Sequence, residues 1–370
     1  MSIDEDSAVE SALERLLSMG RGLPGQLPVE DHGELWAALA RASVGGKRFR
    51  PALLLSTHRA LGGRRPQAAV QVAAAIELLH TAFVVQDDVI DGDQVRRGGP
   101  SLPGDFAQKA RLRGASAEGS RRYGDAAGIL AGDLGMLSAV RAIARCDAPT
   151  AVIDDLLDLV ETTIHGSVAG ELADVRLQLA LDEPAPMREA LAVAELKTAL
   201  YSFQLPLHAA ALLAEADDAV ISALDEIGVL FGIGFQLFDD LLGVFGDEER
   251  TGKSALGDLR EGKRTAMLSH AATTDAWNRL SPLIGRADLD AIGAADARAL
   301  LTSCGSRAWT EDLARWHLDQ ANSAAERHQL PAALVREIRS ATDDVLGAAE
   351  HALRPAAGAA TVETRTGQLA

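Results

Sequence analysis

The sequence predicts an all-α protein of about a dozen helices, because apolar residues recur at helical spacing along most of the chain. Alanine and leucine dominate the 370 residues, aromatic residues make up only 4%, and β-branched runs bounded by turn residues are few. This composition favours helix over sheet. Neither an internal repeat nor a clear linker divides the chain. We therefore expect one domain over residues 1–353 and a disordered, small-residue-rich tail over 354–370.

Two segments predict long buried helices. The segment from Pro66 to Asp91 is apolar nearly all round, as a central helix would be, and Gly92 follows it as a good helix-ending residue. A second such segment runs from about Val220 to Val244 and also finishes in acidic residues. Pro206 lies inside an otherwise helical stretch, so we expect a kink or break there.

The composition also excludes several classes of protein. A formal charge of -17 argues against a general nucleic-acid binder, so an anionic ligand must meet local basic groups or metal ions. Cys146 and Cys304 lack the spacing of a zinc site or a disulfide framework, which fits a reducing cytoplasm. The acidic N-terminus does not resemble a secretory signal. We find no run of about 18 apolar residues, so stable membrane insertion is not expected.

A first acidic cluster, Asp87, Asp88 and Asp91, falls on the last turn of the first buried helix. Asp87 and Asp91 are four residues apart and so share one face. Like charges beside a helix C-terminus are unfavourable unless a cation compensates them, and Mg²⁺ suits carboxylate ligands and phosphates. A solvated acidic turn is the alternative interpretation.

A second acidic cluster, Asp239 and Asp240, follows the second apolar run. Two buried helices that both end in aspartate pairs would allow the carboxylates to face each other. A diphosphate bridged by metal ions is the simplest use of that geometry. The pair of clusters therefore favours a metal-dependent diphosphate site over a solvated turn.

Five segments resemble, in order along the chain, the motifs of the trans-polyprenyl diphosphate synthase family. They are GGKRFRP (45–51), ELLHTAFVVQDD with DGDQVRRGGP, VAGELAD (168–174), KTA (197–199) and FQLFDDLLGVFGDEERTGKSALGDLREGKRT. The resemblance implies a single helical bundle around a central cavity. It also implies an enzyme, commonly a homodimer, that joins isopentenyl diphosphate to an allylic diphosphate with Mg²⁺.

The resemblance assigns roles residue by residue. The diphosphate of isopentenyl diphosphate would be bound by Lys47, Arg50, His80 and Arg97. The allylic diphosphate would be bound by Mg²⁺ ions, three in the family, on Asp87, Asp91 and Asp239, supported by Asp88 and Asp240, and by Arg96, Lys197, Thr198, Gln236 and Lys253. Thr198 and Gln236 would also stabilise the allylic carbocation. Taken alone, Lys47 or Arg50 would be read as a surface charge and His80 as a core histidine.

Two positions depart from the family pattern. Gly243 stands where a third aspartate is usual, and Glu171 replaces a glutamine. Asp247, one turn beyond Gly243, is a candidate substitute for the missing carboxylate.

Product length in the family depends on side chains one turn before the first acidic cluster. Phe83 is large and Ala82 is small, which predicts a C20 product, geranylgeranyl diphosphate, with C15 farnesyl diphosphate as the alternative; Phe83 could also simply pack in the core. A class I terpene cyclase and a non-catalytic subunit of a heteromeric synthase are further alternatives. The cyclase would need an NDxxSxxxE-like motif in place of DDLLG, and regulatory subunits tend to lose aspartates.

Overall fold

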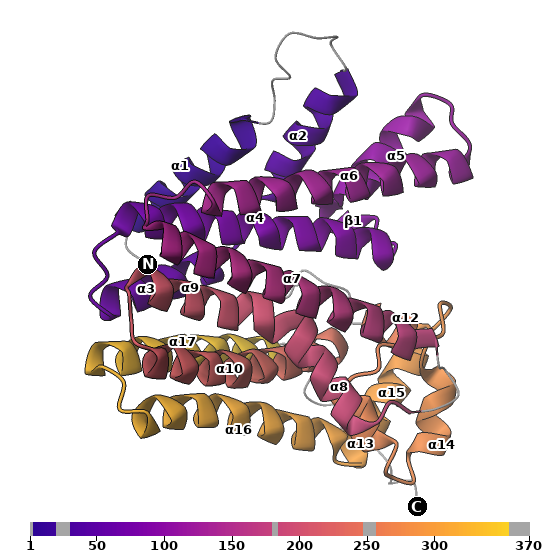
Figure 1. Cartoon of the computed structure of the whole chain (residues 1–370). Coiled ribbons are helices and arrows are strands. Elements are labelled where there is room, and N and C mark those ends of the chain that lie inside the picture. The colour runs from indigo at the N-terminus through magenta and orange to yellow at the C-terminus, as the bar shows by residue number, and fades with distance from the viewer. Residues whose placement is uncertain (1–2, 20–29, 180–183, 247–256, 355–370) are drawn as a thin grey trace, which may run out of the picture.

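The computed structural model describes residues 3–19, 30–179, 184–246 and 257–354, and this part of the chain is almost entirely helical (Figure 1). The helices are α1 (Ile3–Met19), α2 (Glu30–Ala42), α3 (Phe49–Ala60), α4 (Pro66–Ile90), α5 (Leu102–Leu112), α6 (Ala117–Ile143), α7 (Thr150–Leu179), α8 (Met187–Ala194), the π-helix η1 (Glu195–Gln204), α9 (Leu205–Leu213), α10 (Asp218–Phe245), α12 (Gly257–Glu261), α13 (Ala266–Ala271), α14 (Trp277–Leu280), the 3₁₀-helix η2 (Ser281–Leu283), α15 (Ala291–Ser303), α16 (Ser306–Arg327) and α17 (Ala332–Leu353). The strands β1 (Val95–Arg96) and β2 (Gly99–Pro100) form a small antiparallel hairpin. The all-α prediction is confirmed. The expected tail beyond Leu353 lies almost wholly outside the described residues and stays a prediction.

Two hydrophobic cores lie next to each other in the bundle. The first belongs mainly to α1, α2, α4, α6 and α9, and the second mainly to α10, α13, α15, α16 and α17. Figure 1 shows α4 and α6 as neighbours on one side, α10, α16 and α17 on the other, and α7 and α9 between them. The helix η1 contacts both α7 and α10. The ends of α4, α7, η1 and α10 are therefore available to form one site.

The helix α4 ends as its sequence predicts. The Asp91 N–H donates to Asp87 O, Gly92 has φ of +73°, and the Asp93 N–H donates to Asp88 O at 2.8 Å. This is the Schellman arrangement, in which a residue with positive φ terminates the helix and satisfies its last carbonyl groups. Because Gly92 fixes the end of α4, it also fixes where the first acidic cluster lies.

Pro206 breaks the helical ladder, as expected, but the form of the break is a π-helix. Residues Glu195–Gln204 adopt π-helical hydrogen bonding and α9 begins at Leu205. Proline has no N–H to donate to the preceding turn, and π-helical segments relieve such a mismatch. The wider turn changes which side chains of η1 face α7 and α10.

The exclusion of membrane-spanning helices was too strict. By length and composition, α4, α6 and α10 are apolar enough to cross a membrane. In the most apolar window of each helix, 72% of the α4 residues, 44% of α6 and 56% of α10 are buried within the protein. Packing within the bundle therefore accounts for most of the apolar surface of α4, and for least of that of α6.

Candidate active site

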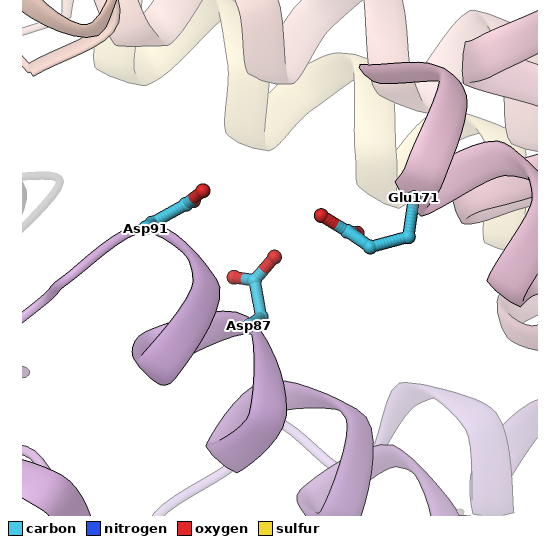
Figure 2. Close-up of side chains that lie close together, drawn as sticks. All are labelled: Asp87, Asp91 and Glu171. Carbon is cyan, nitrogen blue, oxygen red and sulfur yellow. The ribbon is translucent and has the colours of Figure 1, made fainter. Parts of the chain in front are cut away.

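The first acidic cluster meets a carboxylate from α7. Ligand oxygens of Asp87, Asp91 and Glu171 all lie within 4.8 Å of one another. Figure 2 shows the three carboxylates pointing toward a common point, two from the last turn of α4 and one from α7. Such convergent oxygen donors fit a hard divalent ion such as Mg²⁺. Glu171, predicted only as a departure from the family pattern, is thus a candidate metal ligand.

Lys197 of η1 neutralises part of this negative charge. Its Nζ lies 2.9 Å from Asp174, 3.0 Å from Glu171 and 3.4 Å from Asp87. Burial alone would lower the pKa of Lys197, but these three carboxylates together raise it above its ordinary value. The lysine is therefore a permanent cation between α4 and α7.

A close approach of α7 and η1 makes these contacts possible. A Cβ atom at Gly170 would lie only 2.6 Å from the backbone nitrogen of Lys197. A side chain at this position would force the two helices apart. Gly170 therefore allows the neighbouring Glu171 to reach the ammonium group.

Burial makes two aspartates of the first cluster, Asp88 and Asp91, weaker acids than usual. Burial, and then the charge of Asp87, raises the pKa of Asp91 to about 7. Burial also raises the pKa of Asp88 to about 6, although Arg96 opposes this shift. A bound cation would favour the ionised form of both groups, and near pH 7 this would matter most for Asp91.

A tight hairpin directs Arg96 and Arg97 to different partners. Arg97 and Gly98, the two loop residues between β1 and β2, both have positive φ, as a type I′ turn requires. Arg96 contacts Asp88 at 2.5 Å and Asp87 at 3.4 Å, whereas Arg97 donates to Val44 O at 3.0 Å. Arg96 therefore lies against the first acidic cluster, where the allylic diphosphate is expected.

A second group of basic residues surrounds His80. Burial, and then the charges of Arg50 and Arg97, hold the pKa of His80 well below its ordinary value. The buried atoms His80 Nδ1 and Arg50 Nε have no hydrogen-bond partner among the described residues. Arg50 donates to Ser202 at 2.8 Å and lies over the ring of Tyr201. These unsatisfied groups and positive charges form a site suited to an anion.

The GGKRFRP segment contributes unequally to this basic site. Lys47 is exposed, while Arg48 is buried, has a φ of 49° and pairs with Glu77 at 2.8 Å. Arg48 thus anchors the segment, and Arg50 is the residue that reaches the His80 side. The structure brings together Arg50, His80 and Arg97. Lys47 is near Arg50 in the sequence, but its side chain lies at the surface.

Thr198, Gln236 and Asp240 form a hydrogen-bonded chain between η1 and α10. Thr198 Oγ1 donates to Gln236 Oε1 at 2.5 Å, and Gln236 Nε2 donates to Asp240 Oδ1 at 2.7 Å. Burial raises the pKa of Asp240 to about 8. Asp240 therefore orients the Gln236 amide, and the amide in turn fixes the hydroxyl of Thr198.

Lys263 connects the two acidic regions. Its Nζ lies 4.0 Å from Asp91, 3.4 Å from Asp258 and 3.2 Å from Glu261. Burial alone would lower the pKa of Lys263, but Asp258, Glu261 and Asp91 raise it above its ordinary value. The segment after α10 thus returns a cation to the end of α4. The predicted residues Lys253 and Asp247 lie outside the described residues.

The chain was compared with known proteins by sequence and by fold. A family model described as polyprenyl synthetase matches residues 34–297. The chain belongs to the polyprenyl synthetase family.

Named relatives of this family differ in product. A geranylgeranyl diphosphate synthase of Methanosarcina mazei is 29% identical over 323 residues, covering 86% of this chain and 88% of its own. A (2E,6E)-farnesyl diphosphate synthase of Mycobacterium bovis is 32% identical over 298 residues, covering 77% and 75%. A geranylgeranyl pyrophosphate synthase structure from Corynebacterium glutamicum, complexed with isoprenyl diphosphate and magnesium, superposes with a TM-score of 0.83 and 25% identity, covering 93% of this chain and 99% of its own. The all-helical fold of the polyprenyl synthetases is thereby confirmed for this chain.

The two residues expected to set product length point in different directions. The Phe83 ring meets the edge of Tyr201 from η1, with ring centroids 5.2 Å apart at 82°. Ala82 is fully buried and faces α6, since a Cβ atom added at Gly135 of α6 would lie only 3.0 Å from the Cβ of Ala82. Of these two residues, Phe83 is therefore the one that lies beside the η1 residues of the polyprenyl synthetase site.

Sequence reasoning assigned no role to four charged residues of this site: Glu171, Asp174, Asp258 and Lys263. All four lie within segments that resemble polyprenyl synthetase motifs, which was the available signal. Spacing along one helix could not have indicated their roles, because each of them contacts a residue of another element.

Proposed function

We propose that this protein condenses isopentenyl diphosphate with allylic diphosphates and releases all-trans geranylgeranyl diphosphate, using Mg²⁺. The main support for this proposal is that Asp87, Asp91 and Glu171 converge beside the ammonium group of Lys197. A diphosphate leaving group needs cations at its oxygens, and this arrangement offers both metal ligands and a fixed positive charge. The fold and family of the relatives support the same reaction class.

The chain provides separate sites for the two diphosphates. The allylic diphosphate would lie at the end of α4, where Arg96, Lys197 and Lys263 can donate to its oxygens. Asp87, Asp91 and Glu171, with Asp239 as the resemblance implies, would hold Mg²⁺, three ions as in the family, and these ions would stabilise the departing diphosphate as Lewis acids. The C–O bond of isopentenyl diphosphate stays intact in the reaction, so its diphosphate needs no metal ion as a leaving group. Arg50 and His80 can therefore hold it by direct hydrogen bonds.

The remaining steps need no side-chain nucleophile. When the allylic C–O bond breaks, the oxygen of Thr198 would offer its lone pairs to the positive charge, because Thr198 donates its proton to Gln236. The double bond of isopentenyl diphosphate attacks the allylic carbon. A proton is then lost to the released diphosphate.

The C20 product is supported by the contact between Phe83, one turn before Asp87, and Tyr201 of η1. An aromatic pair at this position would limit the growth of a chain that extends along α4. Farnesyl diphosphate is the second candidate, supported by the mycobacterial relative.

We also propose a homodimer formed through α6 and α7. These helices expose large apolar residues, Ile129, Leu130, Leu137, Val168 and Leu172 being between 48% and 70% accessible. Burying such a surface against a second copy is favourable. Light scattering coupled to size exclusion should give twice the 38.9 kDa chain mass. A monomer, or a chain recovered only with membranes, contradicts the proposal.

A cytoplasmic location stays a prediction that fits two free cysteines, and cell fractionation tests it.

The test of function is product analysis with purified protein, Mg²⁺, labelled isopentenyl diphosphate and each of dimethylallyl, geranyl and farnesyl diphosphate. We expect a C20 product from every primer and, in Asp87→Ala, a loss of roughly 100-fold or more. Asp288→Ala is the matched control, because the Asp288 side chain is 77% exposed and pairs with Arg286 at the surface.

The outcomes separate the alternatives. A hydrocarbon formed from a prenyl diphosphate without isopentenyl diphosphate would identify a terpene cyclase. No product from the wild-type protein alone would identify a non-catalytic subunit. Equal turnover in Asp87→Ala and wild type would remove the acidic cluster from the reaction.

A further inference from the structure

Gly243 leaves room for a neighbouring side chain on the face of α10 that carries the second acidic cluster. It follows Asp239 by four residues, so a side chain at 243 would lie on the same face as the second acidic cluster. Glycine in a helix interior is less stable than alanine, which indicates a specific reason for its presence. The family pattern would place a carboxylate here.

The carboxylate of Asp258 occupies this space. Its Oδ2 atom lies 1.7 Å, and its Cγ 2.5 Å, from the position that a Cβ atom on Gly243 would take. A contact this short means that Asp258 and any side chain at 243 cannot both keep their positions. Asp258 therefore places a carboxylate in the space that the family pattern would give to an aspartate at position 243.

The second oxygen of Asp258 points toward the first acidic cluster. Oδ1 lies 3.4 Å from the Nζ of Lys263, and the same ammonium reaches Asp91 at 4.0 Å. Asp258 thus lies between the second cluster and the end of α4.

We propose that Asp258, from α12, supplies the outer carboxylate of the second magnesium cluster, and that Gly243 is required to admit it. This inference rests on the proposed Mg²⁺-dependent function and assigns a role to one additional residue of the same site. In this arrangement the function of Gly243 is to leave room for the carboxylate of Asp258. Asp258 would hold Mg²⁺ directly or through a bound water, and the space at Gly243 fixes where its carboxylate lies.

Four variants test the exchange. Asp258→Asn removes the charge at nearly constant volume, and Gly243→Ala adds a methyl group that displaces the Asp258 carboxylate. The double variant Gly243→Asp with Asp258→Ala returns a carboxylate from α10 itself, and the alanine leaves the space that this carboxylate needs. Glu261→Gln is the matched control, because it removes one charge from the same Lys263 without touching the space at Gly243.

The measurement is calorimetric titration of Mg²⁺ into protein saturated with inorganic diphosphate, with circular dichroism to confirm folding. We expect both single changes, Asp258→Asn and Gly243→Ala, to weaken Mg²⁺ binding by about tenfold or more. The double variant and Glu261→Gln should stay within roughly threefold of wild type.

Each other result counts against the inference in a distinguishable way. Wild-type affinity in Asp258→Asn overturns it. A weakened Asp258→Asn that the double variant does not rescue also overturns it, because the carboxylate would then not be acting in the place of residue 243. Absence of Mg²⁺ binding by the wild-type complex would instead overturn the proposed function itself.

Discussion

Replacing Lys197 by methionine tests how the metal-free protein tolerates its own acidic site. The ammonium group lies within 3.4 Å of Asp87, Glu171 and Asp174, so the variant leaves three carboxylates without their shared cation. Methionine keeps the length and apolar stem of the side chain. The effect therefore reports the charge and not a cavity.

The expected loss of stability follows from the burial of Lys197. Removing one partner of a buried ion pair costs roughly 3–5 kcal/mol. Because the lysine side chain is 23% exposed, solvent screening reduces this to about 2–3 kcal/mol. With about 2.1 cal/mol/K of unfolding entropy per residue, a chain of 370 residues should lose about 3–4 °C in Tm.

Mg²⁺ should reverse the loss in the variant. In the wild-type protein Lys197 competes with Mg²⁺ for Asp87 and Glu171, so Mg²⁺ alone should raise its Tm little. In Lys197→Met the vacant carboxylates should bind Mg²⁺ more tightly and recover most of the Tm, while turnover falls about 100-fold or more for lack of the donor to diphosphate.

Differential scanning calorimetry with and without Mg²⁺, combined with the product assay, measures both effects. Lys109→Met is the control, since that ammonium pairs with Asp105 and Glu34 away from the site and should change Tm by about 1 °C or less. Equal Tm increases from Mg²⁺ in wild type and Lys197→Met, or full activity in the variant, would refute the reasoning.

Two other measurements address chain length and protonation. Phe83→Ala removes the ring that meets Tyr201, so farnesyl diphosphate and labelled isopentenyl diphosphate should give products longer than C20; an unchanged product length would show that Phe83 is only a packing residue. Because the pKa of Asp91 is raised to about 7, its carboxylate becomes protonated as the pH falls, and Mg²⁺ affinity should decrease about tenfold per pH unit below 7. Calorimetric titration of Mg²⁺ at pH 6, 7 and 8 in the presence of diphosphate tests this. Asp91→Asn is the reference, because its pH dependence reports the protonation of the diphosphate without that of Asp91. Parallel pH dependences in the two proteins would contradict the assignment.

The helices that carry the site were predictable because their signals are local. The segment ending at Asp91 is apolar on all sides, and Gly92 provides the positive φ that ends it, so α4 agrees with the prediction to within one residue. Pro206 indicated a break for the same local reason. That the break is a π-helix depends on how α7 and α10 pack against η1, which the sequence does not state.

The candidate site was predictable only where one helix supplies the geometry. Helical spacing places Asp87 and Asp91 on one face, and Figure 2 shows that face meeting Glu171. The contacts of Glu171 and Lys263 join helices far apart in sequence, so no spacing rule indicates them. The role of Asp258 depends on an absent side chain, at Gly243, and is visible only when the space around that glycine is known.

The two diphosphate sites differ in what already neutralises their charges. Lys197 and Lys263 are engaged by carboxylates, so they can turn to an allylic diphosphate only when another cation takes those carboxylates over. Arg50 contacts the neutral hydroxyl groups of Tyr201 and Ser202, and within the part of the chain that the structure describes its Nε has no hydrogen-bond partner. An anion can therefore bind Arg50 and His80 without displacing a carboxylate. It follows that Mg²⁺ should control entry of the diphosphate that is cleaved, while the diphosphate that is retained binds to the protein directly.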